Sequence, residues 1–331
     1  MPESLPAAAP SRARVIAAYA VVYVVWGSTY LAINFAIATL PPFLMAGVRF
    51  LVAGLVLYVW MRARGAVRPS AAQWKVAAII GAFLLLGGNG AVVWAEQFVP
   101  SGITALLVAT VPLWMALIGW LGPDRRRPTP RVSLGLFVGM IGIVVLIGPG
   151  ALIGQGGDVD LIGSAVLILG ALAWAAGSLY ARRAATPPSP QLGTAMQMLS
   201  GGLLLLILGL ATGEGRGLDA GAISVTSASA LLYLIVFGSL VGFSAYVWLL
   251  RVEPPTRVST YAYVNPVVAV GLGWLFAGEA LTAQTLLAAA IIVGAVVLIV
   301  TTPGPAAPRT VALPPSTASG PRRRRRGATS A

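Results

Sequence analysis

Long apolar runs constrain the fold of this chain more than any other feature of its sequence. Each run is about 20 residues long, is bounded by charges, Pro or Gly, and carries almost no ionisable side chain. As a helix, such a run crosses the roughly 30 Å hydrocarbon core of a bilayer. Only 9% of all residues are charged, against about 25% in soluble domains. The sequence therefore predicts an integral membrane protein.

The runs predict an all-α polytopic fold, because the backbone must satisfy its own hydrogen bonds in lipid and the runs are too long for barrel strands. They predict ten transmembrane helices, at about 15–37, 43–61, 74–97, 102–121, 132–148, 161–181, 191–212, 226–249, 258–277 and 282–301.

The basic residues predict the orientation of these spans. Twenty of the 22 Lys and Arg lie in the tails or in alternate loops, and Arg216 is the single base in the opposite loops. Since cytoplasmic loops are enriched in Lys and Arg, we expect both termini to be cytoplasmic. The location indicated is the cell membrane, crossed many times.

The residues that are missing exclude several classes of chemistry. Without Cys or His, the chain has no disulfide, no thiolate or imidazole metal site and no His-based catalytic site. We also find no Walker loop for ATP, and no acidic residue is predicted at the centre of a span. We therefore expect no enzyme activity, no metal and no cofactor. The net charge of +13 belongs to the loops, so we expect no nucleic-acid partner.

The segments outside the spans divide the chain further. We predict a cytoplasmic tail at 1–14, an external loop at 149–160 and a disordered basic tail at 302–331, with repeats at 15–148 and 161–301 between them. The five-Arg run of the C-terminal tail suits anionic lipid headgroups, although it also suits an additional topology signal. The sequence leaves open whether the protein forms a homodimer.

An internal repeat relates the two halves. An offset of 154 residues pairs Trp94 with Trp248, Pro100 with Pro254, Pro112 with Pro266 and Trp120 with Trp274. The unit is five spans. Because five is odd, the second copy enters the membrane in the opposite sense, which is typical of transporters built as inverted repeats.

The motifs resemble those of EamA-type permeases, ten-helix members of the drug/metabolite transporter superfamily. The resemblance covers about 15–301 and rests on the order and spacing of Trp26-Gly-Ser-Thr-Tyr30, Ala46-Gly-Val-Arg-Phe50, Val99-Pro-Ser-Gly-Ile103, Glu253-Pro254, Tyr263-Val-Asn-Pro266 and Gly278-Glu279. The sequence departs from the family pattern at Gly122-Pro-Asp124, where the family often has Gly-Glu. The resemblance implies export of small metabolites such as amino acids or their derivatives, through a cavity between the repeats.

Polar and aromatic residues inside the spans are the candidates for substrate contact, since such groups usually face the bundle interior or a wet cavity. The alternative for each is helix packing or, near span ends, the interfacial aromatic belt. The candidates for the cavity are Trp26, Tyr30, Asn34, Asn89, Thr110, Trp114, Trp174, Gln197, Tyr246, Tyr261, Tyr263 and Asn265.

Two charged residues form a separate pair of candidates. Arg49 lies within the second span and Glu96 near the external end of the third, so an ion pair between them is geometrically possible. Glu96 alternatively serves an external gate or a proton or amine site. The symmetry-related prolines Pro112 and Pro266 are predicted helix breaks, which favour a binding site at mid-membrane depth.

These features favour a secondary exporter of a small metabolite, an amino acid, a derivative or a drug-like compound, that works by alternating access. The first alternative is a solute/solute antiporter of sugar-phosphate or nucleotide-sugar type, which needs at least two basic residues in the cavity to neutralise phosphate. The second is a membrane receptor or assembly factor that transports nothing and has a dry, apolar interior.

Overall fold

The computed structural model describes residues 11–121, 129–148, 160–185, 187, 189–216, 218–253, 258 and 260–301. Most of the predicted tails and of the external loop, and the Gly122-Pro-Asp124 corner, lie outside these residues. Within them the chain is helical and contains no strand. The first half consists of α1 (Arg12–Ala20), η1 (Val21–Val25), α2 (Trp26–Ile37), α3 (Pro42–Ala63), α4 (Ala71–Gly81), η2 (Ala82–Asn89), α5 (Gly90–Ala95), α6 (Ser101–Val108), α7 (Val111–Leu121) and α8 (Pro130–Ile147).

The second half follows residues 149–159, which lie outside the described part of the chain. It consists of α10 (Leu161–Ala181), α11 (Pro190–Ala211), η3 (Glu214–Arg216), η4 (Ala220–Ala222), α12 (Val225–Tyr233), η5 (Leu234–Val241), α13 (Gly242–Val252), α15 (Tyr261–Ala277) and α16 (Ala283–Val300). In the described residues nine helical segments are long and apolar enough to cross a membrane, and Tyr261–Ala277 is a shorter apolar helix. The predicted ten-helix membrane fold is confirmed, with boundaries that shift by only a few residues.

Local sequence signals explain where these helices begin. Ser70 accepts a hydrogen bond from the Gln73 backbone N–H at 3.2 Å, and the Gln73 side chain accepts one from the Ser70 N–H at 2.9 Å. This reciprocal capping satisfies donors that the first turn of α4 would leave unpaired. The Asp160 side chain caps α10 by accepting a hydrogen bond from the Gly163 backbone N–H. Pro130 and Pro190 stand in the first turn of α8 and α11, where their missing N–H costs nothing.

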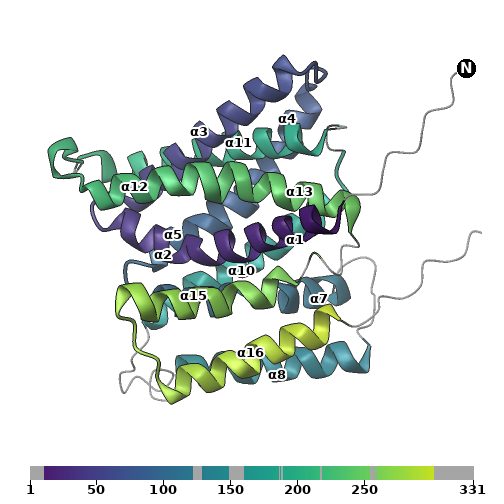
Figure 1. The fold of residues 1–331 in the computed structure, drawn as a ribbon, viewed down its shortest axis with the longest axis vertical. Helices are drawn as coiled ribbons and strands as arrows, with labels where there is room; N and C mark the ends of the chain where they lie inside the picture. The colour runs from purple at the N-terminus through teal and green to yellow at the C-terminus, as the bar shows by residue number, and fades with distance from the viewer. Residues whose placement is uncertain are drawn as a thin grey trace, which may run out of the picture.

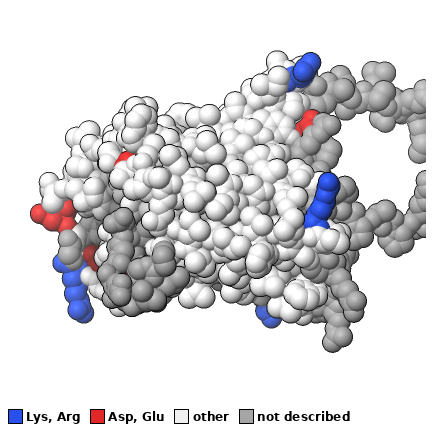
Figure 2. All heavy atoms as spheres, turned by 90° about the horizontal axis from the view of Figure 1, so that it is seen from below, with Lys and Arg blue, Asp and Glu red and all other residues white. Residues whose placement is uncertain are grey.

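The helices run roughly side by side and stack into a bundle (Figure 1). α3 packs on α11 at one end of the stack, and α8 packs on α16 at the other. Between these pairs, α2 contacts α12 and α15, while α10 contacts η2, α5, α6 and α7. Charged side chains gather towards the two ends of the helices in Figure 2, with a broad uncharged belt between them. That distribution suits a bundle immersed in lipid.

Glycines bring α8 and α16 close together. A Cβ on Gly135 would lie 2.6 Å from the Ile299 Cγ1, and one on Gly142 would lie 2.7 Å from the Ile292 Cγ1. Side chains at these positions would hold the backbones apart, so glycine permits close helix approach.

Three spans contain π-helical stretches that the sequence did not indicate. They are η1, η2 and η5, in the first, third and eighth spans. The offset of 154 residues places η5 over residues 80–87, which overlap η2, so two of the stretches lie at equivalent places in the repeats. Such turns shift backbone carbonyls out of the regular α-helical pattern and are frequent at functional sites.

The two predicted helix breaks behave differently. Near Pro112 the span divides at Ala109 and Thr110 into α6 and α7, as predicted. Pro266 instead lies inside the continuous helix α15, so the prediction of a break there is wrong. A proline inside a helix removes one hydrogen bond, but neighbouring helices can hold the helical path.

Candidate functional site

A cavity of about 570 Å³ lies among the central helices. Its size is within the range of pockets that hold small organic molecules. Nine sequence candidates are among the residues that line it: Trp26, Tyr30, Arg49, Asn89, Pro112, Trp174, Tyr261, Asn265 and Pro266. The structure thus brings together residues from both halves of the chain.

The cavity reaches one end of the bundle and stops short of the other. At one end its lining includes Arg182, which follows the last residue of α10, and Val300, the last residue of α16. Towards the opposite end the lining stops at Ile33 and Val92, about one helical turn before the ends of α2 and α5, and at Ala105, about one turn after the start of α6. The cavity is therefore deep and blind, and its mouth lies at the end where the described chain begins and finishes.

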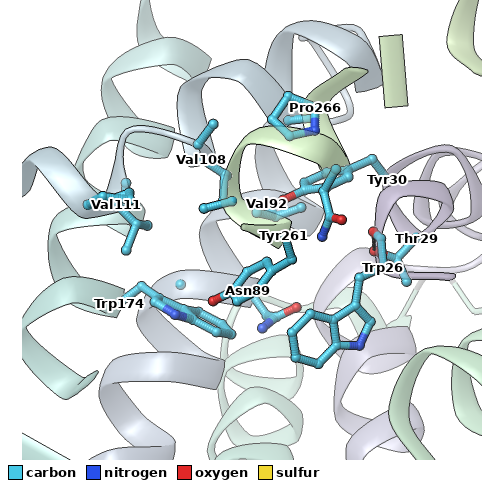
Figure 3. A pocket seen from close by; sticks show the side chains of 18 of the residues that line it. Trp26, Thr29, Tyr30, Asn89, Val92, Val108, Val111, Trp174, Tyr261 and Pro266 are labelled. Carbon is cyan, nitrogen blue, oxygen red and sulfur yellow. Dashed lines mark hydrogen bonds between the residues drawn. The ribbon is translucent and has the colours of Figure 1, made fainter. Parts of the chain in front are cut away.

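Aromatic rings form much of the inner wall (Figure 3). The Trp26 ring lies 5.3 Å from the Tyr261 ring, edge to face, and 5.2 Å from the Phe243 ring, centroid to centroid. The Tyr246 ring lies 5.1 Å from the Trp26 ring and 5.7 Å from the Tyr261 ring, centroid to centroid. Figure 3 shows Trp26, Tyr261 and Trp174 arranged around the Asn89 amide. Such surfaces offer flat apolar contact with a few polar groups.

The two tryptophans of the wall occupy related environments. Trp174, from the first helix of the second half, lies on Gly88, where a Cβ would be 2.6 Å from its Cε3. Trp26, from the first span, lies on Gly242, where a Cβ would be 2.8 Å from its Cδ1. Gly88 and Gly242 are themselves 154 residues apart. Each half therefore contributes one Trp that packs on a glycine of the other half's third span.

The π-helical stretch η5 holds two of the site residues in place. The Trp26 Nε1 donates a hydrogen bond to the Gly238 carbonyl at 3.1 Å, and the Arg49 Nε donates one to the Ser239 Oγ at 3.0 Å. The guanidinium carbon of Arg49 also lies 4.7 Å from the centroid of the Phe50 ring. These contacts fix a buried cation in the cavity wall, since Arg49 is only 4% exposed.

The predicted ion pair between Arg49 and Glu96 is not formed in this conformation. Glu96 is 4% exposed, and neither of its carboxyl oxygens has a hydrogen-bond partner among the described residues. It does not line the cavity. Helix positions alone bring the two residues near each other, but the side chain of Arg49 turns to Ser239 instead.

A second glutamate closes the blind end. Gly278 adopts a left-handed conformation, with φ 67°, which ends α15 and turns the chain towards α6. The Glu279 carboxylate then accepts hydrogen bonds from the Ser101 N–H at 2.7 Å, the Ser101 hydroxyl at 2.6 Å and the Gly102 N–H at 2.9 Å. A carboxylate is favoured at a helix N-terminus, so this contact ties the second half to the first at the blind end.

Backbone and amide groups supply further polarity to the cavity. Asn265 is 7% exposed, and its Oδ1 has no hydrogen-bond partner in the described part of the chain. Proline cannot donate to the carbonyl four residues earlier, which is Val108 for Pro112 and Ala262 for Pro266. All of these residues line the cavity. The Asn265 Oδ1 is therefore an acceptor available to a bound molecule.

The remaining candidates lie outside the cavity lining: Asn34, Thr110, Trp114, Gln197, Tyr246 and Tyr263. Thr110 and Trp114 bond to each other, Nε1 to Oγ1 at 3.1 Å, and Thr110 also donates to the Leu107 carbonyl at 2.6 Å. They support the break between α6 and α7. The sequence suggests that these six residues contact the substrate, but none of them lines the cavity.

The sequence reading missed several lining residues, which are Thr29, Phe50, Met115, Arg182 and Phe243. For two of these residues the sequence contains a signal that indicates a position in the cavity lining. Thr29 and Met115 lie three residues after Trp26 and Pro112, hence on the same helix faces. Arg182 belongs to a loop whose basic residues also set the membrane topology, and its sequence context does not distinguish that role from a contact with the cavity.

A multi-pass helical bundle that encloses a deep central cavity has the architecture of a membrane transporter. Comparison with known proteins agrees with that class. The model of the EamA-like transporter family matches residues 14–148 and 161–301. The chain belongs to the EamA-like transporter family.

Several relatives with similar sequences are named as transporters. It is 39% identical over 267 residues to the uncharacterized inner membrane transporter YedA of Escherichia coli K12, covering 80% of this chain and 84% of YedA. It is 25% identical to the uncharacterized transporter YvbV of Bacillus subtilis, covering 80% and 84%. A solved crystal structure with 20% identity has the same fold, with a TM-score of 0.60 over 87% of this chain and 98% of that one. The protein is thus a multi-pass membrane transporter.

Proposed function

We propose that the protein is a secondary transporter that exports a small metabolite, an amino acid, a derivative or a drug-like compound, by alternating access. The observation that carries the proposal is the central cavity, which is lined by both halves, open at one end and blind at the other. A transporter needs such a site, accessible from one side at a time.

The charge distribution gives the cavity a direction. Its mouth lies at the bundle end that carries Arg12, Arg62, Arg131 and Arg182. The positive-inside rule supports a cytoplasmic position for this end, and we propose that both termini lie there and that the conformation is inward-facing. An exporter loads its substrate from that side. The inner membrane is the proposed location, as the name of the E. coli relative gives it for that protein.

The helix contacts support an inverted repeat. The second and seventh spans pack together as α3 and α11, and the fifth and tenth as α8 and α16. Contacts of α2 with α12 correspond to those of α10 with η2 and α5. These pairings are the ones expected when the same five-helix unit occurs twice around a two-fold axis in the membrane plane.

The antiporter of phosphorylated solutes remains a second candidate, and one observation favours it. Arg182 lines the cavity together with Arg49, so the two basic residues that such a substrate requires are present. A receptor that transports nothing fits poorly, because its interior would be dry and apolar, whereas Asn89, Asn265 and Arg49 face this cavity.

An accumulation assay tests the export proposal. Cells that lack their own exporters would express the protein and be challenged with toxic amino-acid analogues, aromatic acids and cationic dyes. We expect resistance and lower intracellular accumulation for at least one class, and loss of both in Trp26→Ala. Tyr263→Ala, whose side chain lies outside the cavity, is the matched control. Equal accumulation with and without the protein for the whole panel would refute the proposal.

A further inference from the structure

The electrostatics of the cavity select among substrate classes. Among the described residues, the lining contains two guanidinium groups, those of Arg49 and Arg182, and no carboxylate. Charges interact more strongly in a low-dielectric interior than in water. The two guanidinium groups therefore disfavour a cationic compound next to Arg49 and Arg182, although the tryptophans alone would suit it.

Arg49 has capacity for an external anion. Its Nε is engaged by Ser239, and one face of the guanidinium lies towards Phe50. The four remaining N–H groups make no hydrogen bond within the described residues. Glu96 acts on the guanidinium electrostatically, but neither of its carboxyl oxygens accepts a hydrogen bond. A buried guanidinium with free donors is a strong partner for a carboxylate.

The groups around Arg49 indicate the rest of the ligand. A Cβ on Gly238 would lie 3.1 Å from the Arg49 Nη2, and the Gly238 carbonyl accepts the Trp26 hydrogen bond. A Cβ on Gly27, the residue after Trp26, would lie 3.2 Å from the Asn265 carbonyl oxygen. The cation, an indole face and the unpartnered Asn265 Oδ1 therefore lie within one small region of the cavity.

We propose that Arg49 binds the carboxylate of the transported compound, an organic anion with a flat apolar body that packs on Trp26 and Trp174. Asn265 accepts a hydrogen bond from a donor on that body, and Arg182 draws the anion into the mouth. This inference rests on the proposed transport function and names its substrate class. A monoanion is favoured over a phosphate dianion, because Arg49 is buried whereas Arg182 is exposed at the mouth.

Binding to the purified full-length protein tests the assignment separately from transport. The probes share one aromatic body: phenylacetate, its amide phenylacetamide, the cation phenethylamine, and phenyl phosphate. Dissociation constants come from the concentration dependence of thermal stabilisation or from tryptophan fluorescence. A charge-assisted hydrogen bond in a buried site is worth about tenfold or more in affinity. We expect phenylacetate to bind at least about tenfold more tightly than the amide, and phenethylamine more weakly still.

Variants assign the preference to Arg49. Arg49→Gln should abolish the difference between phenylacetate and the amide, and Arg49→Lys should keep part of it. If Arg49→Gln does not fold, Ser239→Ala provides a milder change, because it removes only the acceptor that orients the guanidinium. Arg182→Gln should slow association of phenylacetate while leaving the preference over the amide.

Each outcome decides the proposal. A preference for the amide or the amine, an anion preference that survives in Arg49→Gln, or binding of none of the four probes would overturn it. Tighter binding of phenyl phosphate would overturn the carboxylate assignment and favour the antiporter candidate. If the binding pattern is as expected but cells gain no resistance to any compound, the export proposal fails and the anion site stands.

Discussion

The hydrogen bonds of Glu279 make the blind end a defined target for perturbation. Its carboxylate accepts three hydrogen bonds at the start of α6, two of them from backbone N–H groups. Glu279→Gln keeps one side-chain oxygen and replaces the other by an amide NH2. The NH2 is itself a donor, so it cannot accept a hydrogen bond from the backbone N–H that it faces. At least one hydrogen bond and the favourable charge at the helix N-terminus are lost.

The expected magnitude follows from these contacts. A hydrogen bond to a charged group contributes about 1.5–3 kcal/mol, and a carboxylate at a helix N-terminus adds about 0.3–1 kcal/mol. Since Glu279 is partly exposed, we take the lower part of that range, about 1.5–2 kcal/mol. A difference of about 1.4 kcal/mol is tenfold in an equilibrium constant. The population open at the blind end should therefore rise at least about tenfold.

Cysteine labelling measures this population, because the natural chain contains no Cys. Thr104 is fully buried in α6, next to the Glu279 contact, so Thr104→Cys reports access to the blind end. A membrane-impermeant maleimide should label Thr104→Cys slowly in the parent and at least about tenfold faster in the Glu279→Gln background. Asp219→Asn, an exposed acidic side chain, is the control. Unchanged labelling would refute the role of Glu279 in closing this end.

Three further variants test packing, burial and the cavity wall. Gly142→Ala should lower the free energy of unfolding by about 1–3 kcal/mol, because its Cβ would lie 3.2 Å from the Ile292 backbone N; Gly294→Ala, with nothing within 4 Å, should leave the melting temperature unchanged or raised. Glu96→Gln should insert and melt like the parent, since no hydrogen bond is lost, and a large drop in melting temperature would reveal a hidden ion pair. Tyr261→Ala should reduce transport strongly and Tyr263→Ala only slightly, and equal losses would contradict the cavity described.

Periodicity and composition were sufficient to predict the membrane spans. The apolar run and the capping residues at its ends set the length of each helix, so the pattern of residues predicts that length. Pro112 likewise marked a real division between α6 and α7. Pro266 shows the limit, because whether a proline breaks a helix depends on the neighbours that hold the chain on either side of it.

The cavity residues were only partly predictable for a physical reason. A helix face can be read from spacing, but the neighbour that it meets depends on tertiary packing. Tyr30 and Asn34 share a face, yet only Tyr30 reaches the cavity. Arg49 was expected to meet Glu96, but η5 presents Ser239 to it. No spacing rule indicated the π-helical turns that position such partners.

Glycine and tryptophan together set the width of the cavity, and this relation can be tested directly. Gly88 and Gly242 occupy equivalent positions in the two halves, and each lies under one Trp of the cavity wall. In Gly88→Ala the new methyl group would lie 2.6 Å from the Trp174 Cε3, so the ring must shift into the cavity. In Gly242→Ala the Trp26 ring must shift similarly, which also strains its hydrogen bond to Gly238.

Either variant should narrow the site without changing its charge. The affinity for a bulky anion such as 1-naphthylacetate should then fall more than the affinity for phenylacetate, because the larger ring needs the cavity volume that the shifted Trp ring occupies. Misplaced ring packing costs about 1–3 kcal/mol, so the ratio of the two affinities should change by about fivefold or more. Gly119→Ala, which meets no atom within 4 Å, should leave the ratio unchanged. A ratio that stays constant in both glycine variants would mean that the two tryptophans do not bound the substrate site.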